Sequence, residues 1–440
     1  MMRLQQQAQA LVENSYYVDT AHAATRHPPL QGEIQADVCV VGAGLAGLSA
    51  ALELSKRGMR VVVLEGMHVG WGASGRNGGQ ALAGYSSEME PFERQLGAES
   101  ARAAWEMSLD ALRLMRERIA QYAIDCDWTP GAMTVAVTPQ KARALLAWAE
   151  HMQRDYGYTH LQPFDADPLR AVIGSRRYCA GVLDDFAGHV HPLNYTLGLA
   201  RAATEAGAIV HEQSPVIEVR PGDARTSTPQ SRALVRTAQG SVRADHVLLA
   251  GNVHLGAVAP RLARRIMPVG TYIVATEPLG RQRALSLIRN RAAVSDNQFV
   301  LDYFRLSGDD RLLFGGRVSY STLSPRDLPA TMRHGMLAVY PQLGDVRITH
   351  AWGGFVDITM NRAPDFGRIA PDVLYLQGFS GHGLALTGLA GLVAAEAIAG
   401  QAGRFDLFAR LRHRPFPGGE LLRTPALVLG MLWYRLRDLL

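Results

Sequence analysis

Three glycines near the start of the chain have the spacing of a dinucleotide-binding turn. They form Gly42-x-Gly44-x-x-Gly47, with an apolar run before the turn and a helical pattern after it. Glycines in this pattern allow a tight turn and a close backbone approach to a pyrophosphate, which the helix N-terminus stabilises. Glu65 ends the next apolar run, where a carboxylate can accept hydrogen bonds from a ribose. The predicted dinucleotide site consists of Gly42, Gly44, Leu45, Ala46, Gly47, Glu65 and Gly66.

A second glycine-rich segment follows directly. Residues 70–80 read Gly-Trp-Gly-Ala-Ser-Gly-Arg-Asn-Gly-Gly-Gln. A core strand or helix does not use so many glycines, and a simple surface loop rarely interleaves Ser, Arg, Asn and Gln so closely. The hydroxyl, amide and N–H groups suit a phosphate and the edge of a heterocycle, which favours FAD over NAD. The predicted cofactor contacts in this loop are Ser74, Gly75, Arg76, Asn77, Gly78, Gly79 and Gln80.

These two motifs and a third one resemble the D-amino-acid-oxidase-like family of FAD-dependent amine oxidoreductases, which includes sarcosine and glycine oxidases. The third motif is Gly378-Phe-Ser-Gly-His-Gly-Leu384, before the last helical pattern. Shorter segments at 14–17, 188–192 and 429–438 are similar to those of the bacterial members that oxidise gamma-glutamylputrescine. The resemblance implies a non-covalent FAD, because none of the three cysteines lies where some relatives attach the flavin.

The resemblance also assigns contacts outside the glycine-rich loop. Val216 would meet the adenine through its backbone, and Gly251 would pack near the cofactor. A helix N-terminus at the pyrimidine edge would stabilise negative charge on a reduced flavin. His382 could instead be a loop histidine that caps this helix. The residues expected at the pyrimidine edge are Gly381, His382, Gly383 and Leu384.

The sequence departs from amino-acid-oxidising relatives at one informative position. Those relatives carry an arginine shortly after a Trp-x-Gly corner, where it binds the substrate α-carboxylate. Here Val356 or Asp357 takes that place, and Arg362 follows five or six residues later. An acid suits a cationic amine better than a carboxylate, although Asp357 could equally be a turn or capping group. The candidate catalytic residues of the substrate pocket are Trp352, Asp357, Tyr272 and Tyr303, whose aromatic members favour an apolar amine stem.

The resemblance implies oxidation of an amine, gamma-glutamylputrescine or a related polyamine derivative, by hydride transfer to flavin N5 and hydrolysis of the imine to an aldehyde. Two alternatives stay open: an amino-acid oxidase or dehydrogenase that passes electrons to a quinone or protein, and an FAD redox module that needs a partner chain. Some relatives place a lysine over the flavin to help oxygen react. The only lysines here, Lys56 and Lys141, lie elsewhere in the sequence, so O₂ and other electron acceptors both remain possible. No metal-ligating pattern is evident.

The order of the motifs predicts an α/β fold in which a Rossmann-type FAD-binding domain is interleaved with a strand-rich substrate domain. The first strand–helix–strand unit and the last strand–loop–helix unit lie at opposite ends of the chain, so the FAD-binding domain must be discontinuous. We assign 1–125, 186–265 and 358–440 to the FAD-binding domain, and 126–185 and 266–357 to the substrate domain.

The composition is that of a globular protein rather than a disordered or fibrous one, with 48% hydrophobic and 19% charged residues among 440. The net charge of +5 is spread along the chain, so no nucleic-acid partner is expected. Three scattered cysteines and the lack of a signal-peptide pattern lead us to expect a cytoplasmic protein. The apolar segment 425–440 is short for a membrane span; we expect a docked helix, with peripheral membrane contact as the alternative.

Overall fold

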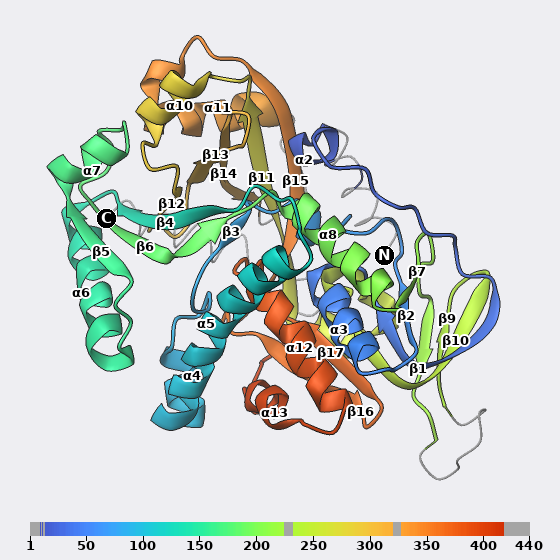
Figure 1. Ribbon diagram of the computed structural model, residues 1–440. Helices are drawn as coiled ribbons and strands as arrows, with labels where there is room; N and C mark the ends of the chain where they lie inside the picture. The colour runs from blue at the N-terminus through green and yellow to red at the C-terminus, as the bar shows by residue number, and fades with distance from the viewer. Residues whose placement is uncertain (1–8, 10, 12–13, 224–231, 320–326, 418–440) are drawn as a thin grey trace.

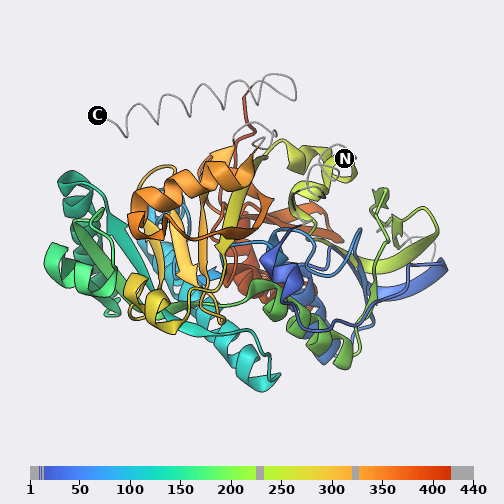
Figure 2. The same ribbon diagram turned by 90° about the horizontal axis from the view of Figure 1, so that it is seen from above.

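A computed structural model describes residues 9, 11, 14–223, 232–319 and 327–417 of the chain. It is a mixed α/β protein built around two sheets that lie side by side, each with its own helices (Figure 1). The view from above shows the first sheet, in blue and yellow-green, at one end and the second, in green to orange, at the other (Figure 2). The predicted α/β class is confirmed. The segment 425–440 lies outside the described residues.

The first sheet contains the predicted dinucleotide-binding turn. Its main path has the order β16-β17-β10-β1-β2-β7, in which the strands from β17 to β7 run parallel. Parallel strands need cover on both faces, and this explains the unbroken apolar runs of β1 and β2. The strands are β1 (Gly32–Val41), β2 (Val61–Leu64), β7 (Ile209–His211), β8 (Glu218–Arg220), β9 (Ala233–Arg236), β10 (Gly240–Leu249), β16 (Asp365–Ala370) and β17 (Val373–Gln377).

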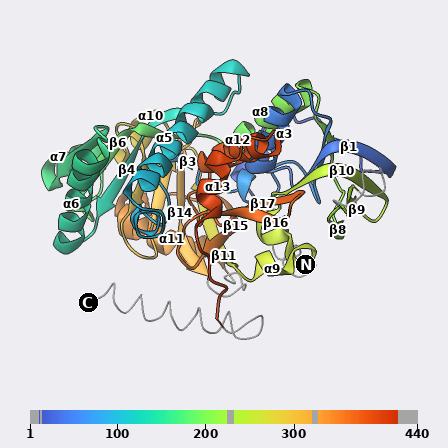
Figure 3. The same ribbon diagram turned by 90° about the horizontal axis from the view of Figure 1, so that it is seen from below.

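A layer of helices covers one face of this sheet. Helices α5, α12, α3 and α8 lie together on this side of the sheet (Figure 3), and contacts join α5 to α12, α12 to α3 and α3 to α8. Short helices that follow β10 cover part of the other face, where Leu255 and Leu262 pack against the strands. The helices of the layer are α3 (Leu45–Lys56), α5 (Ala98–Gln121), α8 (Pro192–Glu205) and α12 (Leu386–Ile398), and those after β10 are η3 (Asn252–His254), η4 (Gly256–Val258) and α9 (Pro260–Ala263).

Helices α3 and α12 approach each other unusually closely. A Cβ atom on Gly391 would lie 2.4 Å from the carbonyl oxygen of Ala46 and 2.6 Å from the amide nitrogen of Ala50. Nearby, the buried Arg118 of α5 donates to the Ser49 hydroxyl at 2.8 Å and to a Glu53 carboxylate oxygen at 3.0 Å. These contacts fix the position of α3, and with it the turn that precedes this helix.

The second sheet is mainly antiparallel and has the order β15-β11-β14-β13-β12-β4-β6-β3, with β5 paired to β6. Helices α10 (Arg281–Leu287) and α11 (Leu328–Val339) pack near one end, and α6 (Pro139–Tyr156) and α7 (Ala166–Val172) near the other (Figure 1). The strands are β3 (Gln80–Ala81), β4 (Thr129–Ala136), β5 (Leu161–Asp165), β6 (Ala180–His189), β11 (Ile266–Thr276), β12 (Ala293–Asp296), β13 (Tyr303–Leu306), β14 (Leu312–Ser319) and β15 (Ile348–Thr359).

The strands of the second sheet do not coincide fully with the predicted domain limits, and these limits stay a prediction. Most strands of the second sheet come from 126–185 and 266–357, but β3 pairs with β6 although it precedes 125. Strands β6 and β15 also cross the predicted limits at 185 and 357. The remaining helices are α2 (Tyr16–Asp19), α4 (Glu90–Leu96), α13 (Gly403–Ala409), η1 (Ala73–Gly75) and η5 (Pro341–Leu343).

Within the described residues, no single helix has the length and apolar character needed to cross a bilayer. The pair α12 and α13 passes such a test only when the two are joined across a bend of 114°. Most residues of α12 are buried inside the protein, where they pack against α3 and α5. The apolar character of α12 is therefore that of a core helix.

We predict that Gly391→Ala destabilises the protein by about 1–3 kcal/mol, because the added methyl group would force α12 away from α3. Gly388→Ala in the same helix is the matched control. There the nearest atom to an added Cβ is Arg118 Nη1 at 3.5 Å, an ordinary contact, and helix propensity favours alanine over glycine by up to about 1 kcal/mol. Urea unfolding of both variants measures the difference; equal stabilities would contradict the close packing.

Candidate active site

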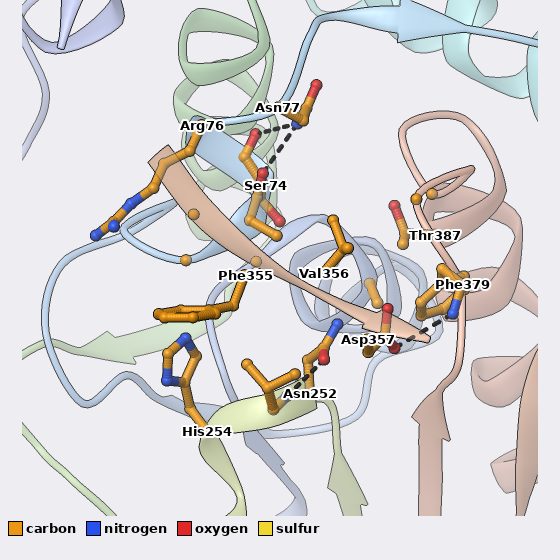
Figure 4. A pocket seen from close by; sticks show the side chains of 18 of the residues that line it. Ser74, Arg76, Asn77, Asn252, His254, Phe355, Val356, Asp357, Phe379 and Thr387 are labelled. Carbon is orange, nitrogen blue, oxygen red and sulfur yellow. Dashed lines mark hydrogen bonds between the residues drawn. The ribbon is translucent and has the colours of Figure 1, made fainter. Parts of the chain in front are cut away.

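A cavity of about 680 Å³ lies where the carboxyl ends of β1, β2 and β10 meet β11 and β15 of the second sheet. Figure 4 shows Phe355, Val356 and Asp357 along β15, with Ser74 and Arg76 on one side and Asn252 and His254 on the other. Ligands of open parallel sheets bind at this edge of the strands. A single chain thus supplies both walls of the cavity, the first sheet one and the second sheet the other.

The turn after β1 is built for close backbone approach. Gly42 has φ +109°, and a Cβ on Gly47 would lie 2.0 Å from the Gly42 carbonyl oxygen. A Cβ on Gly44 would lie 2.8 Å from the Ser74 hydroxyl, which accepts the first helical N–H, that of Leu45, at 3.0 Å. Gly42, Gly44, Leu45 and Ala46 line the cavity, whereas Gly47 packs α3 against the turn. The glycine spacing therefore marks the wall where a pyrophosphate would approach.

Glu65 closes the same wall. One carboxylate oxygen accepts the N–H of Ala43 at 2.9 Å, and the other accepts the N–H of Met67 at 2.9 Å. Burial raises the pKa of Glu65, against these backbone hydrogen bonds, which lower it. Each oxygen has a second lone pair for a hydroxyl donor. Glu65 and Gly66 line the cavity, and Val216 and Gly251 lie along the same wall.

The glycine-rich loop at 72–80 is held by hydrogen bonds within the loop and by packing against the core. Asn77 donates to the carbonyl oxygens of Ala73 and Ser74, both at 3.0 Å, and accepts the N–H of Gly79 at 2.8 Å. Ser74, Arg76, Asn77, Gly78 and Gln80 line the cavity. The predicted contacts Gly75 and Gly79 do not. Their Cβ positions lie against the backbone oxygens of Gly70 and Val190, at 2.4 and 2.3 Å, so glycine there lets the loop pack on the core.

Trp71, Arg76 and His254 pack together beside this loop, with Arg76 buried and the two rings half-buried. The Arg76 guanidinium lies 4.3 Å from the Trp71 ring centre, and the His254 ring lies 5.3 Å from the same ring. Burial lowers the pKa of Arg76 to about 10 and that of His254 to about 4. Arg76 therefore stays cationic at neutral pH while His254 is neutral. These three side chains place one positive charge, that of Arg76, in the cavity wall.

Asp357 joins the two sheets at the cavity. Its carboxylate accepts the N–H groups of Gly378 and Phe379, the latter at 3.2 Å, so a strand of the second sheet holds the loop after β17 (Figure 4). Burial raises the pKa of Asp357 to about 6, whereas the hydrogen bonds from Gly378, Asn252 and Phe379 lower it. These contacts are those of a capping carboxylate, the second of the two roles left open by the sequence.

The loop at 381–384 forms the opposite rim, and all four predicted residues line the cavity. Gly381 has φ +86°, a conformation that favours glycine. The His382 Nε2 lies 2.9 Å from the carbonyl oxygen of Ala83, which ties this loop to the segment after β3. Burial lowers the pKa of His382, so the ring is neutral. Helix α12 begins at Leu386, with its N-terminus next to this loop.

Two predicted pocket residues do not line the cavity. Tyr272 is buried, and because Met267, Val269 and Thr271 face the cavity, strand alternation turns Tyr272 to the opposite face of β11. Trp352 is also fully buried. It packs 5.0 Å from the Tyr17 ring and donates from Nε1 to the Arg76 carbonyl oxygen at 3.1 Å, so it supports the glycine-rich loop from behind.

Tyr303 lines the cavity as predicted, beside Gly78. Several lining residues were not identified from the sequence. Asn252, at φ +51°, follows the carboxyl end of β10. Ligands of parallel sheets bind at that end of the strands, so this position could have identified Asn252 as a lining residue. Phe299, Leu301 and Phe355 come from loops and strands whose facing depends on tertiary packing.

FAD fits this set of residues. The glycine turn leaves room for a pyrophosphate, Glu65 retains acceptor capacity for a ribose, and Arg76 and the α12 N-terminus supply positive charge. All three cysteines are described and none lines the cavity, in keeping with a non-covalent flavin.

Comparison with known proteins gives the same assignment. Residues 37–397 match the family model of FAD dependent oxidoreductases. The chain is 42% identical over 426 residues to gamma-glutamylputrescine oxidoreductase of Escherichia coli, covering 97% of this chain and 98% of that protein. The chain therefore belongs to the FAD-dependent oxidoreductase family: it is an enzyme, and FAD is its cofactor.

Solved structures share the fold. Glycine oxidase of Geobacillus kaustophilus superposes with a TM-score of 0.71 at 22% identity, covering 86% of this chain and 99% of that chain. L-proline dehydrogenase of P. horikoshii superposes with a TM-score of 0.69 at 20% identity, covering 87% of this chain and 98% of that chain. At identities of 20–22%, these two structures show that the chain has the same fold.

We predict that Glu65→Gln weakens FAD binding by about 1–3 kcal/mol, because an amide nitrogen replaces one acceptor and the charge is lost. Glu212→Gln is the matched control: Glu212 is buried nearby and accepts the N–H of Val69 at 2.8 Å, but it does not line the cavity. Fluorescence titration of each flavin-free variant with FAD measures the dissociation constant. Equal constants for the two variants would contradict the role of Glu65.

A second prediction concerns pH and Asp357. Its pKa is higher in the folded protein, about 6, than the ordinary value of 3.8. Its stabilising contribution is therefore complete below about pH 4 and is lost as the pH rises through 6. Relative to Asp357→Asn, the wild type should lose roughly 3 kcal/mol over that range.

Urea unfolding of the flavin-free chains from pH 4 to pH 8 measures this change. Asp167→Asn, at a side chain that is 89% exposed, is the control and should show no such trend. A stability difference between wild type and Asp357→Asn that stays constant with pH would contradict the prediction.

Proposed function

We propose that this enzyme oxidises an amine that has no carboxylate on the reacting carbon, and that gamma-glutamylputrescine or a related acylated polyamine is the substrate. Val356 carries the proposal. It lines the cavity, and the resemblance places the arginine of amino-acid-oxidising relatives at Val356 or at its neighbour Asp357. An α-carboxylate beside Val356 would lose its solvent without gaining a cationic partner, which costs several kcal/mol.

The residues around Val356 suit a neutral amine. Val269, Phe355 and Val356 present apolar groups to the cavity. Such surroundings disfavour an ammonium ion and shift the substrate toward the free amine, the form that can give up a hydride. FAD held in this cavity would supply the hydride acceptor at its N5, and water would hydrolyse the imine of a primary amine to an aldehyde and ammonia. The contribution of the chain is to desolvate and orient the carbon–nitrogen bond.

The sequence similarity supports the same class of substrate. The Escherichia coli relative, 42% identical over nearly all of both chains, is named for gamma-glutamylputrescine. The alternative of a module that needs a partner chain is disfavoured, because β11 and β15 of the same chain wall the cavity opposite the glycine turn.

Electrons from the reduced flavin pass to O₂ or to another acceptor in this proposal. Lys56 lies on α3 and Lys141 on α6, and neither lines the cavity, so the lysine that helps oxygen react in some relatives has no counterpart among the described lining residues.

The test is anaerobic reduction of the bound flavin in a stopped-flow spectrometer. We predict that gamma-glutamylputrescine reduces the flavin at least about 100-fold more efficiently than glycine, sarcosine or D-alanine, since the lost carboxylate solvation amounts to several kcal/mol. Val356→Arg should decrease reduction by the amine, because it adds bulk and positive charge, whereas Val356→Leu should retain most of it. Faster reduction by the amino acids would overturn the proposal in favour of an amino-acid oxidase.

A further inference from the structure

Arg362 lies at the mouth of the cavity. It follows β15, and its backbone N–H donates to the carbonyl oxygen of Thr359 at 3.2 Å, closing a tight turn at the end of that strand. Arg362 lines the cavity together with Met360 and Leu301, whose exposed fractions of 51% and 38% place this region at the opening. Val356 in the interior wall and Arg362 at the mouth therefore belong to one segment, which consists of β15 and the turn after it.

The backbone of Arg362 adopts an unfavourable conformation. Its φ is +57°, a region that glycine and asparagine occupy at low cost and an arginine only with strain of about 1 kcal/mol or more. A turn that needed only this backbone shape would be more stable with glycine. Such outliers occur often at ligand sites, and Arg362 is one of the positive-φ residues that line the cavity.

The side chain is arranged as an anion receptor. Its guanidinium lies 5.0 Å from the ring centre of Phe299, another lining residue. A guanidinium stacked on a ring keeps its N–H edge available for a bidentate carboxylate. Across the described residues, no aspartate or glutamate oxygen lies within 4.0 Å of this group, in contrast to Arg291, which binds Asp310 at 2.6 Å.

The other charged groups of the cavity wall have different positions and tasks. Glu65 holds the turn after β1, Arg76 is stacked on Trp71, and Asp357 holds the loop after β17. Among the described lining residues, Arg362 is the cation at the mouth, on the side of Phe299, Leu301 and Met360. An anionic substrate group would therefore be attracted to the mouth and not to the wall at Val356.

The length of the strand matches a long substrate. Val356 and Thr359 are three residues apart on β15, a rise of ~10 Å. In gamma-glutamylputrescine, nine covalent bonds separate the reacting carbon from the carboxylate carbon, the number in three extended residues, which also span ~10 Å. An amine that reacts beside Val356 would thus place its far carboxylate beside the turn at Arg362.

We infer that Arg362 is a specificity-determining residue that binds a carboxylate at the far end of the amine substrate. This inference rests on the proposed function, since it assumes that the carbon beside Val356 is the one oxidised. It identifies the substrate class as aliphatic amines of about this length that end in a carboxylate. Phe299 is the platform that orients the guanidinium.

The experiment compares two substrates that differ only beyond the amide. N-Acetylputrescine has the amine, the stem and the amide of gamma-glutamylputrescine but lacks the carboxylate. In the flavin-bound Arg362→Gln enzyme, kcat/KM for gamma-glutamylputrescine should fall about 10- to 150-fold, mainly through KM, and that for N-acetylputrescine should change far less. Arg362→Lys should recover part of the loss, because lysine keeps the positive charge but not the paired N–H donors of the guanidinium.

Arg347→Gln is the matched control. Arg347 is 78% exposed and pairs with Glu277, away from the cavity, so both substrates should behave as in the wild type. Equal decreases for the two substrates in Arg362→Gln would overturn the inference, because they would indicate a general structural role.

A binding measurement separates failure of this inference from failure of the proposed function. Gamma-glutamylbutylamide keeps the carboxylate and the stem, but a methyl group replaces the terminal aminomethyl group, so it has no amine to oxidise. Its dissociation constant, measured from the flavin absorbance change, should rise at least about 10-fold in Arg362→Gln if the arginine binds the carboxylate. That result would support Arg362 even if gamma-glutamylputrescine were not oxidised, whereas equal constants would overturn it.

Discussion

The close contact between α3 and α12 is the constraint on which the cofactor site depends. The N-termini of both helices face the cavity, one after the glycine turn and the other after the loop at 381–384. Because Gly391 lies against the backbone of Ala46 and Ala50, the two N-termini are fixed relative to each other by main-chain contact. The residues at both ends of the cavity, which come from opposite ends of the chain, can therefore act on one ligand.

The second constraint is the connection between the sheets. Asp357 belongs to β15 but binds the amides that follow β17, and Trp352 on the same strand binds the backbone of the glycine-rich loop. One strand of the second sheet thus supports two loops of the first. Between these two residues the same strand presents Val356 to the cavity, so the substrate wall and the cofactor loops share a single support.

The sequence allowed the cofactor side to be predicted in detail because its chemistry depends on local backbone shape. The turn at Gly42 and Gly44 and the acid at Glu65 depend on a few consecutive residues, and the α/β class follows from the order of such units. Even there, the cavity-lining residues could not be separated from supporting ones: Gly47, Gly75 and Gly79 pack on neighbouring backbone.

The substrate side was harder to predict because it depends on which face of a strand a residue occupies. Tyr272 is one residue beyond the lining Thr271, and strand alternation alone moves it out of the cavity. Trp352 was predicted to lie in the substrate pocket, but it lies outside the cavity, behind the glycine-rich loop. Phe299 comes from a segment whose position only the assembled sheets determine, and no local pattern distinguishes it. Asn252 could have been found only from its place after the carboxyl end of β10.

The interleaved strand order also has a consequence for how the protein is made. Strands β1 and β2 leave the ribosome early, but β1 pairs with β10, and β10 pairs with β17, which ends at Gln377. About 300 further residues must therefore be synthesised before the sheet of the nucleotide-binding unit is complete, which takes about 15–60 seconds at ordinary synthesis rates. During this interval the chain exposes surfaces prone to aggregation, and the loop at 381–384 that completes the FAD site does not yet exist. FAD can thus stabilise the finished fold, but it cannot protect the nascent chain.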